Sequence, residues 1–268
     1  MIFLAKNVKF SIIIPNYNKE EYVEETLNSI FNQTYKNFEV IVIDDASSDN
    51  SLEIIKKYDC TTLHTNRLRA GGARNKGLDH ATGDYIIFLD SDDYFTDNTV
   101  LERLNNLITD EDIIFLNYTR DKYGEIITVK EEKEDISYKI ENTKNLGAPT
   151  KCFKKEILEG IRFPEAKRYE DINFALEAMC KADKFAYFED SFFTYRKVPT
   201  SNTTTEVSGE AMIDILEELV KMYRLCLKYP KYKQNILNRI KKDKLNTRLD
   251  ILNHLIEFDE NKFYDYFN

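Results

Sequence analysis

Three short apolar runs, each ending at a polar cluster, restrict the fold of this chain more than any other feature. The runs are Phe10 to Ile14, Phe38 to Ile43 and Tyr85 to Leu89. Apolar runs of this length are typical of strands buried on both faces of a parallel sheet. A helical pattern separates one run from the next, and Thr61 to Thr65 adds a short further strand. The repeat predicts a doubly wound α/β layer with right-handed crossovers.

The helices between these strands should begin at polar caps. We expect Asn18 to cap the first helix, and the Ser47 to Asp49 cluster to cap a second helix that ends near Tyr58. A turn at Gly71 to Asn75 should precede a third helix, which Gly83 terminates.

The pattern changes in the second half of the chain. Ile113 to Tyr118 and Glu125 to Val129 alternate around a Tyr123-Gly124 turn, which predicts antiparallel additions to the sheet. Helices are predicted at three places, namely Val100 to Ile108, from Lys154 onward, and Tyr169 to Lys181.

We divide the chain into an α/β domain over 1–205 and a helical C-terminal extension over 206–268, broken at Pro230. Within the α/β domain the change of pattern separates a first half over about 1–95 from a second half over about 96–205.

Composition limits where the protein is expected to act and which metal sites it can form. The 268 residues contain no run of about 18 apolar residues, so no transmembrane helix is predicted. Met1 to Lys9 does not resemble a signal peptide, and we expect a cytoplasmic protein. Four scattered cysteines predict free thiols, and three dispersed histidines predict no zinc site, which leaves an oxygen-liganded metal.

Charge is uneven along the chain. The net charge is −9, but residues 221–248 hold ten Lys and Arg against one acid, Asp243. Such a segment favours an anionic partner, and peripheral association with anionic lipid at the inner face of the cell membrane is one interpretation. The other is a packed helix whose apolar stripe, including Leu237 and Ile240, faces the core.

Carboxylates gather where the run from Tyr85 ends. Asp90, Asp92 and Asp93 follow that strand, and Asp44 and Asp45 follow the strand from Phe38. Because the carboxyl ends of parallel strands meet at one edge, these side chains should converge with the segment Pro15 to Asn18. Hard oxygen ligands suit Mg²⁺ or Mn²⁺, whereas the alternative interpretation is an acidic turn that caps the next helix.

Five motifs in order point to a known family. They are SIIIPNYN (11–18), VIDDASSD (42–49), ARNKGL (73–78), GDYIIFLDSDD (83–93) and EDINF (170–174). Together they resemble family 2 glycosyltransferases, which are inverting nucleotide-diphospho-sugar transferases with the GT-A fold. The resemblance implies a Rossmann-like, mostly parallel sheet flanked by helices, and it does not cover the helical C-terminal appendage. It also implies that 1–205 is a catalytic domain, with a nucleotide-sugar-binding half over about 1–95 and an acceptor-binding half over about 96–205.

The resemblance implies a donor site for the nucleotide sugar. Pro15 and Tyr17 would wall a uracil ring whose imide N–H donates to Asp44 or Asp45. The other predicted donor-binding residues are Asn18, Arg74, Asn75, Asp90, Ser91, Lys151 and Arg196. For Tyr17 the alternative is a surface aromatic, for Asp44 and Asp45 helix capping, and for Arg74 a structural ion pair.

The resemblance also assigns the chemistry. Asp92, with Asp90, would bind Mn²⁺ or Mg²⁺ on the diphosphate, and Asp93 would be a cap or a supporting group. Asp171 would be the general base toward the acceptor hydroxyl, with Glu170 supporting it, and the reaction would invert the anomeric carbon. Alternatively, these two acids only favour a helix N-terminus.

The expected activity is transfer of a hexose or N-acetylhexosamine from a UDP-sugar to a hydroxyl of a surface glycan or lipid-linked glycan. No nucleic-acid partner is expected. Two alternatives stay open, a sugar nucleotidyltransferase and a nucleotide-sugar-binding scaffold without turnover. The Gly71-Gly72 pair argues against the former, because a phosphate-gripping glycine loop is expected after the first strand rather than the third.

Overall fold

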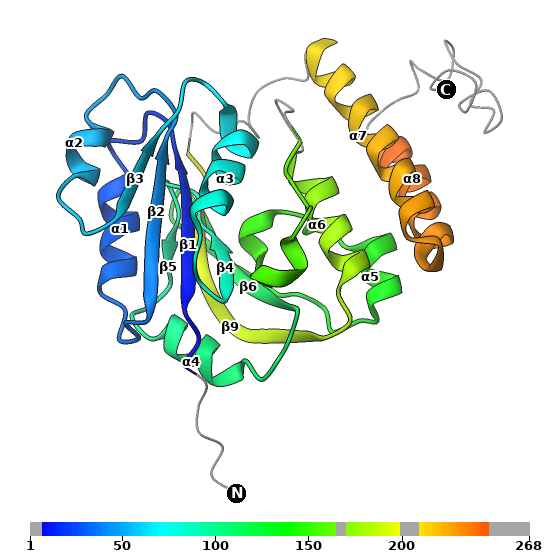
Figure 1. Cartoon of the computed structure of the whole chain (residues 1–268), viewed down its shortest axis with the longest axis horizontal. Helices are drawn as coiled ribbons and strands as arrows, with labels where there is room; N and C mark the ends of the chain where they lie inside the picture. The colour runs from blue at the N-terminus through cyan, green and yellow to red at the C-terminus, as the bar shows by residue number, and fades with distance from the viewer. Residues whose placement is uncertain (1–6, 165–169, 199–208, 247–268) are drawn as a thin grey trace, which may run out of the picture.

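One mixed sheet organises the protein. The computed structural model describes residues 7–164, 170–198 and 209–246. Its strands run in the order β3-β2-β1-β4-β8-β6-β9-β5, with β7 paired to β6 (Figure 1). The strands are β1 (Phe10–Asn16), β2 (Phe38–Asp44), β3 (Thr61–His64), β4 (Tyr85–Phe88), β5 (Tyr94–Phe95), β6 (Ile113–Lys122), β7 (Glu125–Val129), β8 (Lys151–Lys154) and β9 (Phe185–Arg196).

The first four strands confirm the predicted parallel layer. Within this layer β1 lies between β2 and β4, so that Ile13 pairs with Ile41 on one side and Phe88 on the other. Helices separate successive strands, as the α/β class requires. They are α1 (Val23–Phe31), α2 (Ser51–Ile55) and α3 (Arg69–His80), followed by α4 (Val100–Leu107) after β5.

The predicted helix starts need correction. The helix α1 begins at Val23 without a side-chain cap, and Asn18 instead accepts the Ser48 amide with Oδ1. The Asp49 carboxylate does receive the amide of Ser51 at the start of α2, but this helix stops at Ile55 rather than near Tyr58.

The predicted turn at Gly71 to Asn75 was wrong, because α3 already begins at Arg69. The Asp45 carboxylate accepts the amides of Leu68 and Arg69 at 2.7 Å each, which starts the helix before the glycines. A Cβ at Gly71 would lie 2.8 Å from the Pro164 carbonyl oxygen, so the glycine serves close packing rather than a turn.

Two strands of the second half were missed. The short strand β8 inserts between β4 and β6 and is antiparallel to both, while β9 runs parallel to β6. The helix expected from Lys154 is only a 3-10 turn, η2 (Lys155–Leu158). The antiparallel pairing of β6 with β7 confirms the predicted hairpin.

Helices cover both faces of the sheet. Successive residues of β1 alternate, with Ile12 and Ile14 in one apolar layer and Ile13 in the other. The layer of Ile13 also contains residues of α5 (Ile136–Asn142) and α6 (Glu170–Lys181). In Figure 1, α3, α6 and α5 follow one another from left to right. Each apolar layer contains residues from before and after position 95, so the two predicted halves share one core. Their separate roles in binding donor and acceptor stay a prediction.

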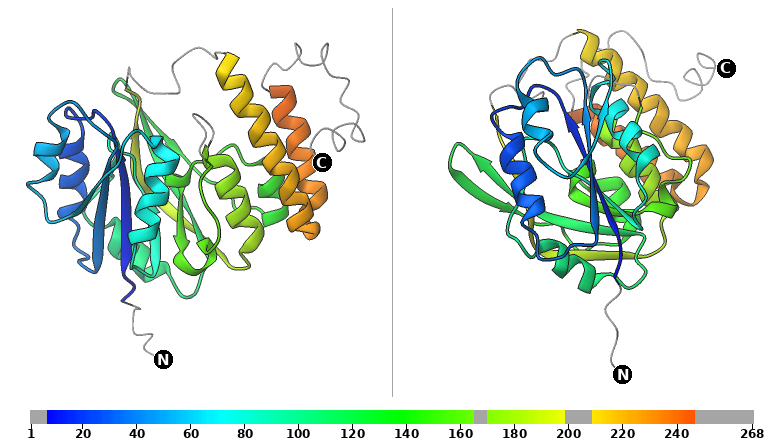
Figure 2. Two further views of the ribbon diagram at one scale, coloured as in Figure 1. Left: turned by 45° about the horizontal axis from the view of Figure 1, so that its top comes forward. Right: turned by 60° about the vertical axis from the view of Figure 1, so that its left-hand side comes forward.

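The C-terminal helices are docked onto this core. They are α7 (Gly209–Lys228) and α8 (Lys233–Asn246), separated by η4 (Pro230–Tyr232) as the break at Pro230 predicted. Met222, Ile236 and Ile240 belong to the same apolar layer as α6, and Figure 2 shows both helices against the side that carries α5 and α6. The rest of the predicted extension, 247–268, lies outside the described residues.

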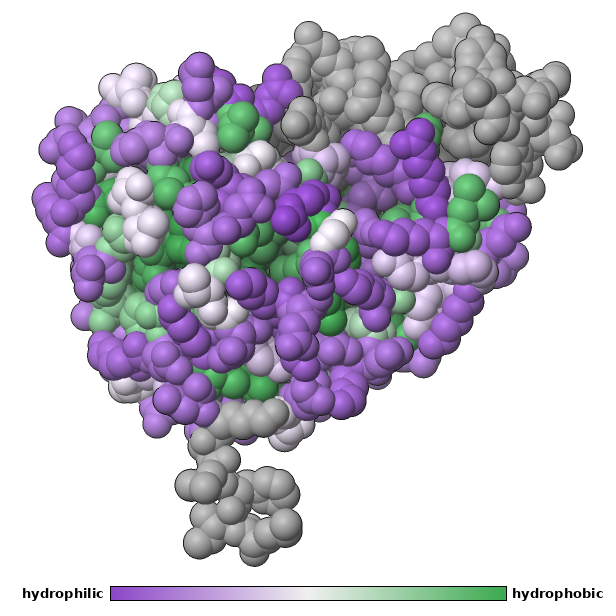
Figure 3. Space-filling model, in the orientation of Figure 1, coloured by the Kyte–Doolittle hydropathy of each residue, from purple (hydrophilic) through white to green (hydrophobic). Residues whose placement is uncertain are grey.

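Hydrophilic residues predominate on the face of the molecule seen in Figure 3. Figure 3 shows hydrophobic side chains on one face in small areas separated by hydrophilic ones. None of the helices in the described ranges is both long and apolar enough to cross a membrane. The four cysteines are free, as predicted.

Candidate active site

The polar ends of the central strands meet, as predicted. In the pairing of β1 with β2, Asn16 lies opposite Asp44, and its Nδ2 donates to Asp44 Oδ1 at 2.9 Å. On the other side of β1, the chain leaves β4 at Leu89 and turns through Asp90. This edge of the sheet carries most of the predicted site residues.

Arg74 joins three carboxylates that are distant in the sequence. From α3, its Nη2 donates to Asp90 Oδ1 at 2.8 Å, and its Nη1 donates to Glu170 Oε1 at 2.9 Å and Asp171 Oδ1 at 2.8 Å. Its side chain is 4% exposed, whereas the Asp90 side chain is 32% exposed and remains accessible to a ligand. We call these four residues the Arg74 cluster.

Burial and crowding change the proton affinities in the Arg74 cluster. The pKa of Glu170 is raised to about 7, first by burial and then by the Asp171 charge, against the opposing effect of Arg74. Burial also raises the pKa of Asp171, again against Arg74. For Arg74, burial would lower the pKa, but the carboxylates of Asp171, Asp90 and Glu170 more than offset it, so the guanidinium stays charged. Both carboxyl groups at the start of α6 therefore hold a proton more readily than a free carboxyl group does.

Asp171 is held in place from a second side. It opens α6 beside Glu170, and its Oδ2 accepts the Ala148 amide at 3.3 Å. The Ala148 loop is held in turn by Lys151, whose Nζ donates to the carbonyls of Asn145 at 2.7 Å and Gly147 at 3.2 Å.

Lys151 was predicted to bind the donor, which stays a prediction, and in the structure its ammonium contacts protein atoms. Its side chain is fully buried, and its ammonium is engaged by the Asn145 and Gly147 carbonyls and Thr150 Oγ1. Burial lowers the pKa of Lys151 to about 8. Lys151 therefore lies behind the site and fixes the loop that contacts Asp171.

Asn75 also has a positioning contact. Its Nδ2 donates to the Phe163 carbonyl and its Oδ1 accepts the Phe163 amide, both at 2.9 Å. The Phe163 ring stacks on Phe174 of α6, with ring centroids 3.8 Å apart. Asn75 thus ties α3 to the segment that packs on α6, instead of pointing to a ligand.

The residues at the carboxyl ends of β1 and β2 are those predicted to contact the uracil of the donor. Pro15 is half-buried, and Tyr17 is 37% exposed with the Arg67 guanidinium 4.0 Å from its ring centroid. Asp44 is buried and accepts from Asn16 and the Ser47 amide, while Asp45 caps α3 and accepts Thr65 Oγ1. Helix capping, the alternative for Asp45, is therefore present; the contact of either aspartate with a base stays a prediction.

Asp92 forms an ion pair with Lys19. Lys19 Nζ lies 2.6 Å from Asp92 Oδ2, and both side chains are mostly buried. Burial raises the pKa of Asp92, as does Asp90, while Lys19 opposes the shift. Asp93 is more deeply buried; burial and then Asp90 and Asp92 raise its pKa well above the usual range. Its Oδ1 accepts the Arg196 amide, which agrees with a supporting role.

The donor set fits a magnesium or manganese ion that takes part of its ligands from a substrate. Among the residues that the structure describes, no group of three or more His, Cys, Asp or Glu is arranged to hold a metal. Asp92 and Asp90 offer hard oxygen ligands, and Mg²⁺ is commonly bound by one or two carboxylates plus phosphate oxygens and water. The ammonium of Lys19 on Asp92 shows that this position favours a cation.

Ser91 and Arg196 flank this acidic turn. Ser91 is buried, and its carbonyl accepts Thr26 Oγ1 from α1 at 2.9 Å. The Arg196 guanidinium donates to Glu25 at 2.6 Å and lies 4.9 Å from the ring centroid of Tyr94. Arg196 is thus next to the acidic turn, as a diphosphate contact would require, although it is paired with Glu25.

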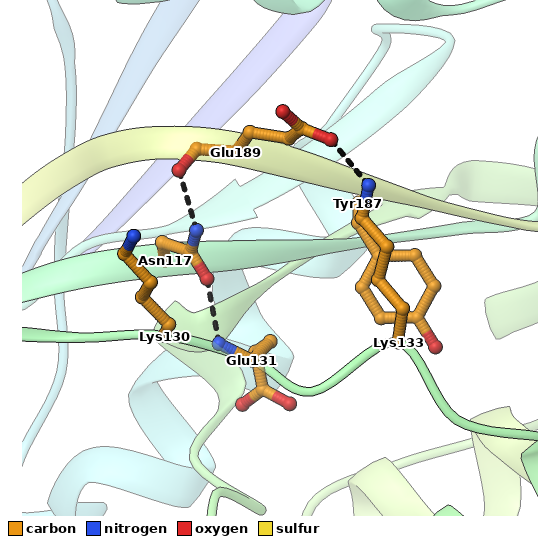
Figure 4. A pocket seen from close by; sticks show the side chains of 6 residues that line it. All are labelled: Asn117, Lys130, Glu131, Lys133, Tyr187 and Glu189. Carbon is orange, nitrogen blue, oxygen red and sulfur yellow. Dashed lines mark hydrogen bonds and ion pairs between the residues drawn. The ribbon is translucent and has the colours of Figure 1, made fainter.

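A small polar pocket lies apart from these residues, between β6, β9 and the segment after β7 (Figure 4). Asn117 crosses it, with Nδ2 donating to the Glu189 carbonyl and Oδ1 accepting the Glu131 amide, each at 2.6 Å. Lys133 pairs with the Glu189 carboxylate at its rim. The pocket contains none of the predicted site residues.

The basic C-terminal segment is partly neutralised by acids of the protein. Lys228 pairs with Glu177 of α6 and Lys242 with Glu141 of α5, while Arg239 Nη1 donates to the Thr143 carbonyl at 2.9 Å. The stripe residues Leu237 and Ile240 pack against the core. The packed-helix interpretation is confirmed for these residues, and association with anionic membrane remains a prediction.

The region of the chain that contains these site residues is similar to known proteins. The family described as Glycosyl transferase family 2 matches residues 11–196, which is more than half of the chain. The chain belongs to glycosyltransferase family 2. Residues 11–196 include Tyr17, the Arg74 cluster, Asp92 and Arg196, so every predicted site residue lies inside the family region.

Curated relatives support this membership. Glycosyltransferase GlyA of Streptococcus pneumoniae is 30% identical over 240 residues, covering 80% of this chain and 34% of GlyA. The poly(ribitol-phosphate) β-N-acetylglucosaminyltransferase TarS of Staphylococcus aureus is 31% identical over 202 residues, covering 70% of this chain and 35% of TarS. The chain therefore spans about a third of the length of these two relatives.

Solved structures confirm the fold. The crystal structure of S. aureus TarS 1-349 in complex with UDP-GlcNAc superposes with a TM-score of 0.72 at 26% identity, covering 90% of this chain and 73% of that one. A Pyrobaculum calidifontis mannosyltransferase shares the fold alone, at a TM-score of 0.57 and 18% identity, covering 95% of this chain and 82% of that one. The GT-A fold predicted from the five motifs is thereby confirmed.

Sequence reasoning missed Lys19, Thr26 and Ala148. Lys19 directly follows the first motif, but its partner Asp92 lies 73 residues away. Thr26 Oγ1 donates to the carbonyls of Ser91 and Asp93, and a threonine inside a helical pattern carries no local signal of such a contact. Ala148 contributes only a backbone amide, which no residue type announces.

Proposed function

We propose that this protein is an inverting, metal-dependent glycosyltransferase that moves a hexose or N-acetylhexosamine from a UDP-sugar to a hydroxyl of a surface-glycan acceptor. The observation that carries the proposal is the Arg74 cluster, in which one buried guanidinium holds the strand-end acid Asp90 beside Asp171. A donor-side acid and a candidate base thus share one site.

The donor half of the proposal draws on the relatives. TarS has been crystallised with UDP-GlcNAc and with UDP, and a Bacillus spizizenii relative, 32% identical over 203 residues, is a poly(ribitol-phosphate) β-glucosyltransferase. By analogy, Pro15 and Tyr17 wall the uracil, with Asp44 or Asp45 at its imide. The acceptor is then a glycan or lipid-linked glycan, met in the cytoplasm or at the inner face of the membrane.

In this mechanism Asp171 removes the proton of the acceptor hydroxyl at its carboxylate oxygen. Arg74 and the Ala148 amide fix the orientation of that carboxylate, and Arg74 opposes the rise in its pKa that burial causes. Glu170 shares the guanidinium, and its pKa is raised to about 7, chiefly by burial. Attack from the acceptor side opposite the leaving diphosphate inverts the anomeric carbon.

Asp92, with Asp90, would hold Mn²⁺ or Mg²⁺ against the diphosphate. When bound, the ion supplies Lewis-acid neutralisation of the charge that develops on the leaving group. Arg196 lies next to the same turn and adds positive charge there.

A donor screen tests the proposal. The chain is incubated with UDP-, GDP- and dTDP-sugars in Mn²⁺, and release of free nucleoside diphosphate is measured, because slow donor hydrolysis needs no acceptor. We expect UDP release from one UDP-sugar that stops on addition of a chelator. Formation of pyrophosphate from UTP and a sugar phosphate would instead indicate a nucleotidyltransferase, and UDP binding without release would indicate a scaffold.

A further inference from the structure

We propose that Lys19 is the protein's own counter-cation for Asp92 and competes with the divalent ion for that carboxylate, so that metal and nucleotide binding are coupled through this lysine. The inference rests on the proposed function, because it takes Asp92 as the metal ligand. It assigns a role to a residue outside the predicted site.

The contact is direct and largely shielded from water. Lys19 Nζ lies 2.6 Å from Asp92 Oδ2, with side-chain exposures of 18% and 17%. Solvent screening and side-chain entropy weaken fully exposed ion pairs. Because both side chains are mostly buried, solvent screens this pair much less. The ammonium occupies one of the two Asp92 oxygens that could bind a metal.

Both backbones that carry the pair are fixed. On the lysine side, the Lys19 amide donates to Ser51 Oγ at 2.9 Å and the Glu20 amide to Asp49 Oδ2 at 2.9 Å. On the aspartate side, Thr26 Oγ1 holds the carbonyls of Ser91 and Asp93. The pair is therefore preorganised, and releasing it requires only rotation of the flexible lysine stem.

Arg74 does not compensate Asp92. The Arg74 guanidinium donates to Asp90, Glu170 and Asp171, so the charge of Asp92 is met by Lys19 in the part of the chain that the structure describes. A divalent ion on Asp92 Oδ2 would lie beside the ammonium, and like charges at this distance repel strongly. Metal binding must displace Lys19.

A bound diphosphate gives the displaced lysine a new partner. Ammonium groups bind phosphate oxygens through charge-assisted hydrogen bonds. Lys19 therefore opposes metal binding in the empty site and supports it once the nucleotide is present. The lysine favours joint binding of metal and nucleoside diphosphate over binding of the metal alone.

The test measures Mn²⁺ binding directly, by the loss of the free-ion signal in electron paramagnetic resonance. Without nucleotide, Lys19→Met should tighten Mn²⁺ binding about three- to tenfold. With Mn²⁺ saturating, the same variant should bind UDP more weakly than the wild type by a similar factor. Lys19→Arg, which keeps the charge, should stay close to the wild type in both assays.

Two controls separate this effect from a general change in charge. Lys56→Met removes a lysine that pairs with Glu53 in an exposed i,i+3 contact, and it should change neither affinity. Asp92→Asn combined with Lys19→Met should remove the gain, because the gain belongs to the Asp92 carboxylate.

The outcomes that contradict the inference are distinct from those that contradict the proposed function. Equal, measurable Mn²⁺ affinities for the wild type and Lys19→Met would overturn the role of Lys19 and leave the metal assignment standing. Absence of Mn²⁺ binding in both proteins, with and without UDP, would overturn the metal assignment and the Lys19 inference together.

Discussion

The site contains two cationic side chains that meet its acids in opposite ways. Arg74 is 4% exposed and donates to three carboxylates, whereas Lys19 is 18% exposed and, among the carboxylates in the described ranges, pairs with Asp92. Arg74 lies on α3, in the packed apolar interior, while Lys19 lies on the loop between β1 and α1. The first is part of the framework of the protein, and the second is a replaceable occupant.

The difference indicates two roles: Arg74 holds carboxylates in position, whereas Lys19 can be replaced by another cation. A planar guanidinium with several fixed donors can hold three acids at once, and an ammonium on a flexible stem can leave without disturbing its surroundings. The Arg74 side of the site is suited to orient a base, and the Asp92 side is suited to gain and lose a metal with each substrate. Four changes to the chain can break or sharpen this distinction.

The largest effect should come from Arg74→Met. It leaves three mostly buried carboxylates without their common counter-charge, and breaking a buried pair in this way costs about 3–5 kcal/mol. We expect that loss in the free energy of unfolding measured with urea, together with loss of activity. Arg74→Lys keeps the charge without the fork and should lie in between. A loss below about 1 kcal/mol would show that Arg74 is no more structural than Lys19.

Gly77→Ala tests whether the helix that carries Arg74 is a rigid support. A Cβ at this position would lie 2.4 Å from Ile13 Cγ2 and 2.9 Å from Ile43 Cδ1, so α3 must move away from the sheet. Overpacking of this kind costs about 1–3 kcal/mol, and the displaced Arg74 should lower kcat as well. Lys76→Ala, on the exposed side of the same helix, is the matched control and should change neither quantity. Unchanged stability and kcat in Gly77→Ala would contradict the support role.

Glu170→Gln tests the sharing of Arg74 through pH. In the wild type, Glu170 takes up a proton as the pH falls through about 7, and more of the guanidinium charge is then available to Asp171. A better neutralised carboxylate is a weaker base, so kcat should fall about two- to fivefold across this range. Glutamine mimics the protonated state at every pH, and the variant should have the low-pH rate without the inflection. An inflection of the same size in the variant would assign it to another group.

The smallest effect on stability should come from Lys19→Met. The pair is single and partly solvated, so the free energy of unfolding should change by less than about 1 kcal/mol, although metal affinity changes. Urea unfolding of this variant beside Arg74→Met measures the contrast directly. A loss as large as that of Arg74→Met would place Lys19 in the framework.

The sequence was a good guide wherever function depends on local order. The strands ending near Asn16, Asp44 and Asp90 were predictable because apolar runs stop abruptly at polar residues. Topology then brought those ends together. Asp171 and Glu170 were found because they open a helix within a family motif.

What could not be predicted depends on contacts between distant segments. The strand β8 is four residues long, and its pairing with β4 and β6 is decided by their apolar surface rather than by its own sequence. The strand β9 had a usable signal in its aromatic alternation, which a register shift opposite Asn117 interrupts. The inward position of Lys151 was hidden, because lysine is rarely fully buried.

The most direct measurement of the central claim, that Asp171 is the base held by Arg74, uses Asp171→Asn. Transfer or donor hydrolysis and UDP affinity in Mn²⁺ are measured on the same preparations, with Asp79→Asn, an exposed aspartate paired with Arg162, as control. The account predicts that kcat falls about 10²- to 10⁴-fold while UDP affinity changes little. Wild-type turnover in Asp171→Asn would contradict it.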